Sequence, residues 1–165
     1  MEINSERTQK GTKETNKVMT VAGIDVSTKK IAIVFLFAGG RYTDFEIVSK
    51  KYNASDRFID LATGFYSFMG NKHVDIVVVE TVPFVQNVKT ALGLAGVEGI
   101  VRTVCALYDI RCEQINNSTW KKALGIGKGK DGIAEYVTRL GYNMISQDVM
   151  DAYCIASAWK VLHDN

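Results

Sequence analysis

The sequence predicts an α/β protein built on one five-stranded mixed sheet that is flanked by helices. Three observations predict this class. Runs of β-branched residues alternate with segments whose apolar residues recur at helical spacing. The elements follow as three strands, a helix, a strand, a helix, a strand and then helices. The length of 165 residues fits a single domain with a sizeable core.

The first 17 residues differ in composition from the rest of the chain. They are polar, of mixed charge and nearly free of large apolar side chains, so we expect residues 1–17 to form a flexible tail. Residues 18–165 then form the folded domain. Its first three strands are expected where β-branched and aromatic residues gather, at 18–26, 30–37 and 41–50.

The later elements follow in order. Phe58, Leu61 and Phe65 recur at helical spacing and predict a helix over 54–69. The continuous apolar run from Val74 to Glu80 is typical of a strand buried on both faces. We expect the remaining elements to be a helix at 88–108, a strand at 110–115, and helices at 118–124, 130–140 and 147–162.

Composition and charge exclude several classes of protein. A net charge of +2 permits a nucleic-acid partner without arguing for one. The three cysteines, Cys105, Cys112 and Cys154, lack C-x-x-C spacing, so we expect reduced thiols rather than a disulfide framework or a zinc site. We find no signal-peptide pattern and no apolar stretch that approaches a membrane span. These features predict a cytoplasmic protein with no membrane contact.

Four acidic residues fall where strands end or where the last helix begins. They are Asp25, Glu80, Asp148 and Asp151. Sites in open α/β sheets gather at strand ends, so the four carboxylates can meet in one cluster. Carboxylates packed together raise one another's pKa, and a divalent cation relieves the repulsion. Mg²⁺ favours oxygen ligands, and two ions about 4 Å apart can activate a water and stabilise the leaving oxygen in phosphodiester cleavage.

Other roles for these acids stay open when each is taken alone. Asp25 precedes Ser27 and can form an Asx-type turn, and Asp148 can simply favour a helix N-terminus. An ordinary surface role explains Asp151 less well, because a largely apolar segment follows it. Glu80 is the strongest signal, because a Glu that closes a run of Ile and Val is unfavourable in a buried strand. Together the four residues favour a metal site.

Two basic segments are candidates for nucleic-acid binding. In the first, small glycines interleave with lysines and allow the backbone to approach phosphates that the ammonium groups neutralise. Its lysines are Lys121, Lys122, Lys128 and Lys130. An ordinary solvated loop explains the same residues. The glycine spacing does not match a phosphate-binding Walker A loop, so we expect no nucleotide cofactor.

The second segment follows Glu80 and leads into the long helix. It contains Phe84, Asn87 and Lys89. An aromatic side chain in this position can stack on an unpaired base at a DNA branch point. Phe84 can equally cap the core beneath the loop. Trp120 and Trp159 lie in amphipathic helices and are expected in the core.

Several motifs, taken in order, resemble one known family. These are "GIDVST", "VVVETVPF", the long Gly/Ala-rich helix, "STWKKALGIGKGK" and "QDVMDAYCIA". They resemble the RuvC-type Holliday junction resolvases from Val18 to the C-terminus. The resemblance implies an RNase H-like fold, a homodimer, and cleavage of four-way DNA junctions with two Mg²⁺ per active site, which Mn²⁺ can replace.

The resemblance also assigns residues. The acidic residues of the family fall on Asp25, Glu80, Asp148 and Asp151, and lysines near the scissile phosphate fall on Lys121 and Lys130. By resemblance, Lys130 stabilises the charge of the transition state. The motif "ETVPF" places its aromatic one position later than in the bacterial enzymes, and the "GIG" loop is about one residue shorter on each side. These departures indicate a phage or viral branch.

We therefore expect an Mg²⁺-dependent endonuclease that resolves Holliday junctions by paired symmetric nicks and leaves 5′-phosphate ends. A four-way junction is roughly two-fold symmetric, so paired cuts call for a two-fold homodimer. Three alternatives stay open: a nuclease of the same fold that acts on other branched DNA or on RNA, a non-catalytic junction-binding protein, and an actin-like phosphotransferase.

Overall fold

The sheet is five-stranded and mixed, as predicted. The computed structural model describes residues 19–82, 87–127, 131–144 and 146–164. The strands are β1 (Val21–Val26), β2 (Lys30–Leu36), β3 (Tyr42–Val48), β4 (Ile76–Glu80) and β5 (Arg111–Ile115). Their order in the sheet is β3-β2-β1-β4-β5. β1 pairs antiparallel with β2 and parallel with β4, so β1 joins the antiparallel and parallel halves of the sheet.

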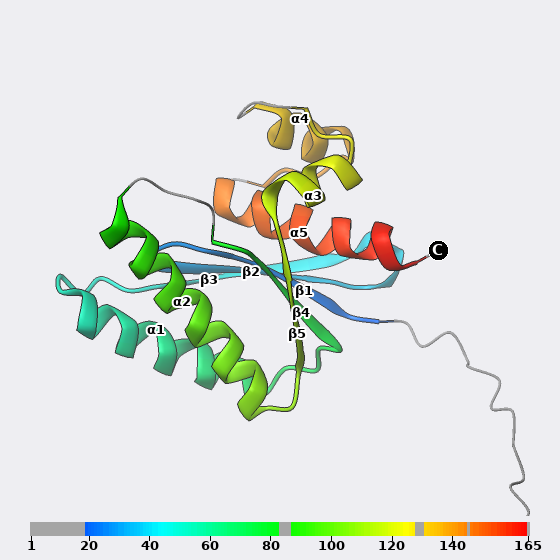
Figure 1. Cartoon of the computed structure of the whole chain (residues 1–165). Helices are drawn as coiled ribbons and strands as arrows, with labels where there is room; N and C mark the ends of the chain where they lie inside the picture. Colours follow the sequence, from blue (N-terminus) through cyan, green and yellow to red (C-terminus); the bar gives the residue numbers. More distant parts are fainter. Residues whose placement is uncertain (1–18, 83–86, 128–130, 145, 165) are drawn as a thin grey trace, which may run out of the picture.

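Helices cover both faces of the sheet (Figure 1). They are α1 (Ala54–Met69), α2 (Val88–Leu107), α3 (Asn117–Ala123), α4 (Asp131–Arg139) and α5 (Gln147–His163). Figure 1 shows α1 and α2 on one face and α3, α4 and α5 on the other. A short 3₁₀ turn, Ala38–Gly40, connects β2 to β3. The predicted elements are all present, with ends that differ by a few residues.

The sheet separates two hydrophobic clusters, because side chains alternate between its faces. On the α5 face, Val21, Val34 and Val78 pack with the helices above them. On the α1–α2 face, Ile24 and Val79 pack with the helices below. Both tryptophans belong to the α5 side. Trp120 is 0% exposed and Trp159 is 4% exposed, which confirms their predicted place in the core.

Gly23 sets how closely α5 can approach the sheet. A Cβ atom on Gly23 would lie 2.0 Å from the Ala152 carbonyl oxygen and 2.7 Å from the Ala156 backbone nitrogen. Only glycine leaves room for this backbone-to-backbone approach. The contact holds the first turns of α5 beside the carboxyl end of β1.

Some predicted features lie outside the described residues. These are the tail at 1–17, Phe84, Lys128 and Lys130. Their predicted roles stay predictions.

Candidate active site

Neighbouring parallel strands bring Asp25 and Glu80 together. Ile24 of β1 pairs with Val79 of β4, so the next residues along the two strands are Asp25 and Glu80. The alternation of side chains directs both carboxylates away from Ile24 and Val79, to the α5 face. A cleft of about 110 Å³ at this edge is lined in part by Asp25 and Glu80. The strands thus form half of the predicted acidic cluster.

The first turns of α5 supply the other half. Asp148 and Asp151 lie one turn apart on this helix. The charges of Asp151, Glu80 and Asp148 all raise the pKa of Asp25, which shows that the four carboxylates share one environment. Burial is the largest cause, and the total effect raises the pKa of Asp25 from its ordinary 3.8 to about 8. The predicted cluster is therefore assembled from β1, β4 and α5.

Glu80 lies under the short helix α3. Burial raises the pKa of Glu80, while the Asn117 amide, the Trp120 indole and the Lys121 charge act in the opposite direction. The Trp120 Nε1 is buried and makes no hydrogen bond of normal geometry with any residue that the structure describes. The sequence predicts Trp120 in the core but gives no sign that its indole faces Glu80. The residue therefore both fills the core and borders the site.

Asp151 has a different balance of neighbours. Burial raises its pKa to about 6, and the charges of Glu80 and Asp148 add to this effect. Gln147 Nε2 donates a hydrogen bond of 2.8 Å to Asp151 Oδ1, and this bond lowers the pKa again. The charge of Lys121 also lowers it. The cluster thus contains two carboxyl groups, Asp25 and Asp151, that hold protons well above the ordinary range of aspartate.

One basic residue at this site was missed by sequence analysis. Lys30, the first residue of β2, lies 2.7 Å from Asp148 Oδ2 and 3.0 Å from Glu46 Oε1. The strand pattern could have indicated that Lys30 lies on the same face as Asp25, because Lys30 shares a face with Ala32 and Ala32 pairs with Asp25. Recognising it also required the position of α5, which the sequence pattern does not give.

The other predicted basic residues divide into those near the carboxylates and those farther away. Lys121 lies near Glu80 and Asp151, since its charge lowers both pKa values. The neighbouring Lys122 is exposed. Asn87 caps α2, because its Oδ1 accepts a hydrogen bond of 3.2 Å from the Thr90 backbone N–H. Lys89 is exposed and lines a separate small pocket of about 170 Å³ between α1 and α2.

The carboxylate cluster fits Mg²⁺ in donor chemistry and in charge. Its four side chains offer only oxygen donors, and each carboxylate near Asp25 raises its pKa rather than stabilising its charge. Among the described residues, no group of three or more His, Cys, Asp or Glu side chains is placed so that it could hold a metal ion. The cluster thus fits Mg²⁺ in the type and charge of its donors.

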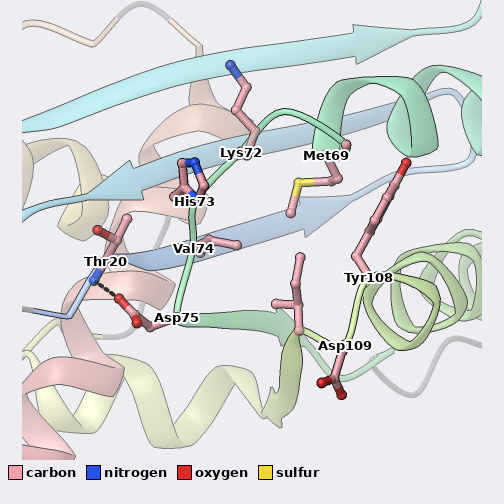
Figure 2. Close-up of a pocket in the computed structure, with 10 residues that line it drawn as sticks. Thr20, Met69, Lys72, His73, Val74, Asp75, Tyr108 and Asp109 are labelled. Carbon is pink, nitrogen blue, oxygen red and sulfur yellow. Dashed lines mark hydrogen bonds between the residues drawn. The ribbon is translucent and has the colours of Figure 1, made fainter.

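A larger pocket lies at the opposite end of the sheet (Figure 2). Its volume is about 520 Å³, and its lining includes Thr20, Asp75 and Ile110, which directly precede β1, β4 and β5. Thr20 donates its backbone N–H to Asp75 Oδ2 at 2.9 Å, as the dashed line in Figure 2 shows. Asp25 and Glu80 lie at the carboxyl ends of the same strands. This pocket is thus separate from the acidic site.

The raised pKa values predict how stability depends on pH without metal. Between about pH 4 and pH 8, folded Asp25 keeps a proton that the unfolded chain has released, so its contribution to the free energy of unfolding falls as pH rises. Asp25→Asn does not titrate. With EDTA present, we expect the variant to be increasingly more stable than the wild type from pH 4 to pH 8. Thermal unfolding followed by circular dichroism measures the midpoint of each protein at each pH. A difference between the two midpoints that stays constant from pH 4 to pH 8 would contradict the prediction.

The chain resembles known proteins in both sequence family and fold. The family model of RuvC, crossover junction endodeoxyribonuclease, matches residues 21–159. The fold resembles Thermus thermophilus RuvC in complex with a Holliday junction substrate, with 18% identity, a TM-score of 0.70, and coverage of 88% of this chain and 96% of the other.

A second solved structure is similar. The yeast mitochondrial Holliday junction resolvase Ydc2 has 13% identity and a TM-score of 0.59, with 87% of this chain and 78% of the other covered. These likenesses confirm the predicted RNase H-like fold. No curated protein sequence matches the chain.

Proposed function

Because this chain belongs to the RuvC family of crossover junction endodeoxyribonucleases, we propose that its carboxylate cluster hydrolyses phosphodiester bonds in Holliday junctions by paired symmetric nicks. One observation carries the assignment of the site. The pairing of β1 with β4 sets Asp25 beside Glu80, and the close contact of Gly23 with Ala152 brings the start of α5, with Asp148 and Asp151, to the same face. In agreement with this geometry, the charges of the other three carboxylates raise the pKa of Asp25. Such an accumulation of like charge is unfavourable unless it serves to bind a cation.

We assign the four carboxylates as the ligands of two Mg²⁺, with Mn²⁺ able to replace them. Bound Mg²⁺ would neutralise charge on the scissile phosphate and lower the pKa of the attacking water. The chain itself supplies the orientation. β1 and β4 hold Asp25 and Glu80 on a rigid sheet, and the close approach of α5 at Gly23 holds Asp148 and Asp151 opposite them.

Lysines beside the cluster suit an anionic substrate. Lys121 lies close enough to affect both Glu80 and Asp151, so its ammonium can contact a phosphate that enters the site. Lys130 remains our candidate for stabilising the charge of the transition state. Lys122, Lys128, Lys89 and Phe84 are proposed to contact the arms or bases of the junction. Cleavage at the site would leave 5′-phosphate and 3′-hydroxyl ends.

Paired cuts require two active sites, and we propose that a homodimer supplies them through the α1–α2 face. By length and composition alone α2 could cross a membrane, so the prediction that no apolar stretch approaches a membrane span was wrong. Only five of its 20 residues are buried. Its exposed side includes Leu92, at 68% exposure, and Gly99, whose Cβ position is open. A second copy of the chain would cover this surface, and we propose that the dimer acts on DNA in the cytoplasm.

Leu92→Glu is expected to dissociate the homodimer without unfolding the subunit. The substitution puts a charge on an apolar surface that a partner would desolvate, and its exposure means that it leaves the core intact. Sedimentation velocity measures the change in mass, and circular dichroism measures the fold. Val161→Glu, at an exposed position of α5, is the matched control and should stay dimeric. If the Leu92→Glu protein stays dimeric, the interface does not lie on the α1–α2 face.

The function is tested with labelled immobile four-way junctions, replication forks, RNA–DNA hybrids and linear duplexes in Mg²⁺. Symmetric nicks in the four-way junction, with ligatable 5′-phosphate ends, are expected. Equal cleavage of forks would favour the broader branched-DNA nuclease. Cleavage of the hybrid alone would favour the RNA nuclease, and tight binding without any cleavage would favour a junction-binding protein.

A further inference from the structure

Lys30 connects the carboxylate cluster to a second set of interactions on β3 and at the start of α5. Its Nζ contacts Asp148 Oδ2 at 2.7 Å and Glu46 Oε1 at 3.0 Å. Glu46 also accepts a hydrogen bond of 2.6 Å from Ser146 Oγ. The four residues, Lys30, Glu46, Ser146 and Asp148, are called the β2–β3–α5 clamp below. They join segments that are about a hundred residues apart in the sequence.

Ser146 attaches the start of α5 to β3 through its side chain. It is the N-cap residue of α5, where a serine side chain commonly accepts a hydrogen bond from the first turn of the helix. Here Ser146 makes no such bond, and its hydroxyl donates to Glu46. The start of α5 is therefore fixed to the sheet at the residue that lies two positions before Asp148.

The clamp orients Asp148 more than it neutralises it. The Lys30 ammonium is shared between two carboxylates, Asp148 at 2.7 Å and Glu46 at 3.0 Å, so its single charge does not neutralise Asp148 alone. The ion pair engages Oδ2 of Asp148 and leaves Oδ1 as the oxygen that can face a metal ion. Carboxylate ligands are commonly held in this way by a donor behind them, and loss of that donor weakens metal affinity.

We propose that Lys30 is a positioning residue that sets the affinity of the carboxylate cluster for Mg²⁺ by fixing the orientation of Asp148. This inference rests on the proposed function, in which Asp148 is a metal ligand. The competing possibility is that the ammonium repels the incoming cation. The two possibilities predict opposite signs for the removal of Lys30, which makes the inference testable by metal binding alone.

The experiment is a calorimetric titration of Mg²⁺, repeated with Mn²⁺, into the wild-type protein and into Lys30→Met. We expect the apparent Kd of Lys30→Met to rise roughly 10- to 100-fold. Lys29→Met removes the adjacent exposed lysine and should bind as the wild type does. Lys30→Arg keeps a charged donor and should restore part of the affinity. Glu46→Gln should weaken binding in the same direction but less, since its side-chain oxygen can still accept from Lys30.

Three outcomes are decisive. Unchanged or tighter binding by a folded Lys30→Met, while Asp148→Asn binds weakly, overturns the inference and leaves the proposed function intact. Absence of Mg²⁺ binding by the wild type overturns both. Because partly exposed ion pairs contribute little to stability, the thermal midpoints of wild type and Lys30→Met in EDTA should be close. A large fall in that midpoint would show a purely structural role and overturn the inference.

Discussion

Glu80→Gln is expected to slow junction cleavage by roughly a thousandfold or more, because several kcal/mol of metal-based transition-state stabilisation depend on the ligand. The amide keeps the size of the side chain but replaces one anionic oxygen by a donor that cannot bind Mg²⁺. Asn117 and Trp120, which lie near the carboxylate, remain in place. Junction binding should be retained, since it depends on phosphate contacts and the change removes a negative charge from the site.

Cleavage of an end-labelled immobile junction, resolved on a sequencing gel, measures this effect, and a gel-shift assay in Ca²⁺ measures binding. Asp60→Asn is the matched control, because Asp60 is an exposed acid on α1, on the other face of the sheet. It should cut like the wild type. Paired nicks by Glu80→Gln at the wild-type rate would exclude Glu80 from the active site.

Gly23→Ala is expected to destabilise the fold by about 3 kcal/mol. The added Cβ atom would lie 2.0 Å from the Ala152 carbonyl oxygen, and a backbone atom cannot turn aside as a side chain can. Either α5 moves away from β1, or the strand bends. Both changes also separate Asp25 from Asp148 and Asp151. The variant should therefore lose activity even at temperatures where it remains folded.

Urea unfolding gives the loss in free energy, and for a chain of this size the thermal midpoint should fall by roughly 6–12 °C. Gly127→Ala makes the same chemical change in the loop before α4, where nothing lies within 4 Å of the new Cβ atom. This control should be about as stable as the wild type, since a surface substitution that meets no neighbour changes stability little. Equal stability of Gly23→Ala and the wild type would contradict the close approach of α5.

Most of the fold could be predicted because local signals and tertiary packing agree. The helix expected at 54–69 has those same bounds in the structure, where Asn53 caps its start and accepts from the Asp56 backbone N–H. The strand expected from Val74 begins two residues later, at Ile76. Asp75, the residue before this strand, donates its backbone N–H to the Thr20 carbonyl oxygen. Such end effects depend on neighbouring segments and are not encoded in a local pattern.

The candidate site was predictable where chemistry conflicts with its surroundings. Glu80 after an apolar strand and Asp25 within one are anomalies that a sequence displays. Lys30 is different, because a lysine at the start of a strand is ordinary. Its importance comes only from Asp148, which lies far along the chain and is brought close by the packing of α5. The shared role of Trp120 was hidden for the same reason, since core packing already explains a buried tryptophan.

The separation of the two hydrophobic clusters by the sheet has a practical consequence for engineering. The α5 face carries the carboxylates, and the α1–α2 face carries the proposed contact with a second copy. Complementary charges introduced on α2 could enforce a heterodimer without touching the chemistry on the other side. If one protomer then carried Glu80→Gln, the proposed pair of cuts would be reduced to a single cut. The separation of the two faces would thus allow the design of an enzyme that nicks only one strand of branched DNA.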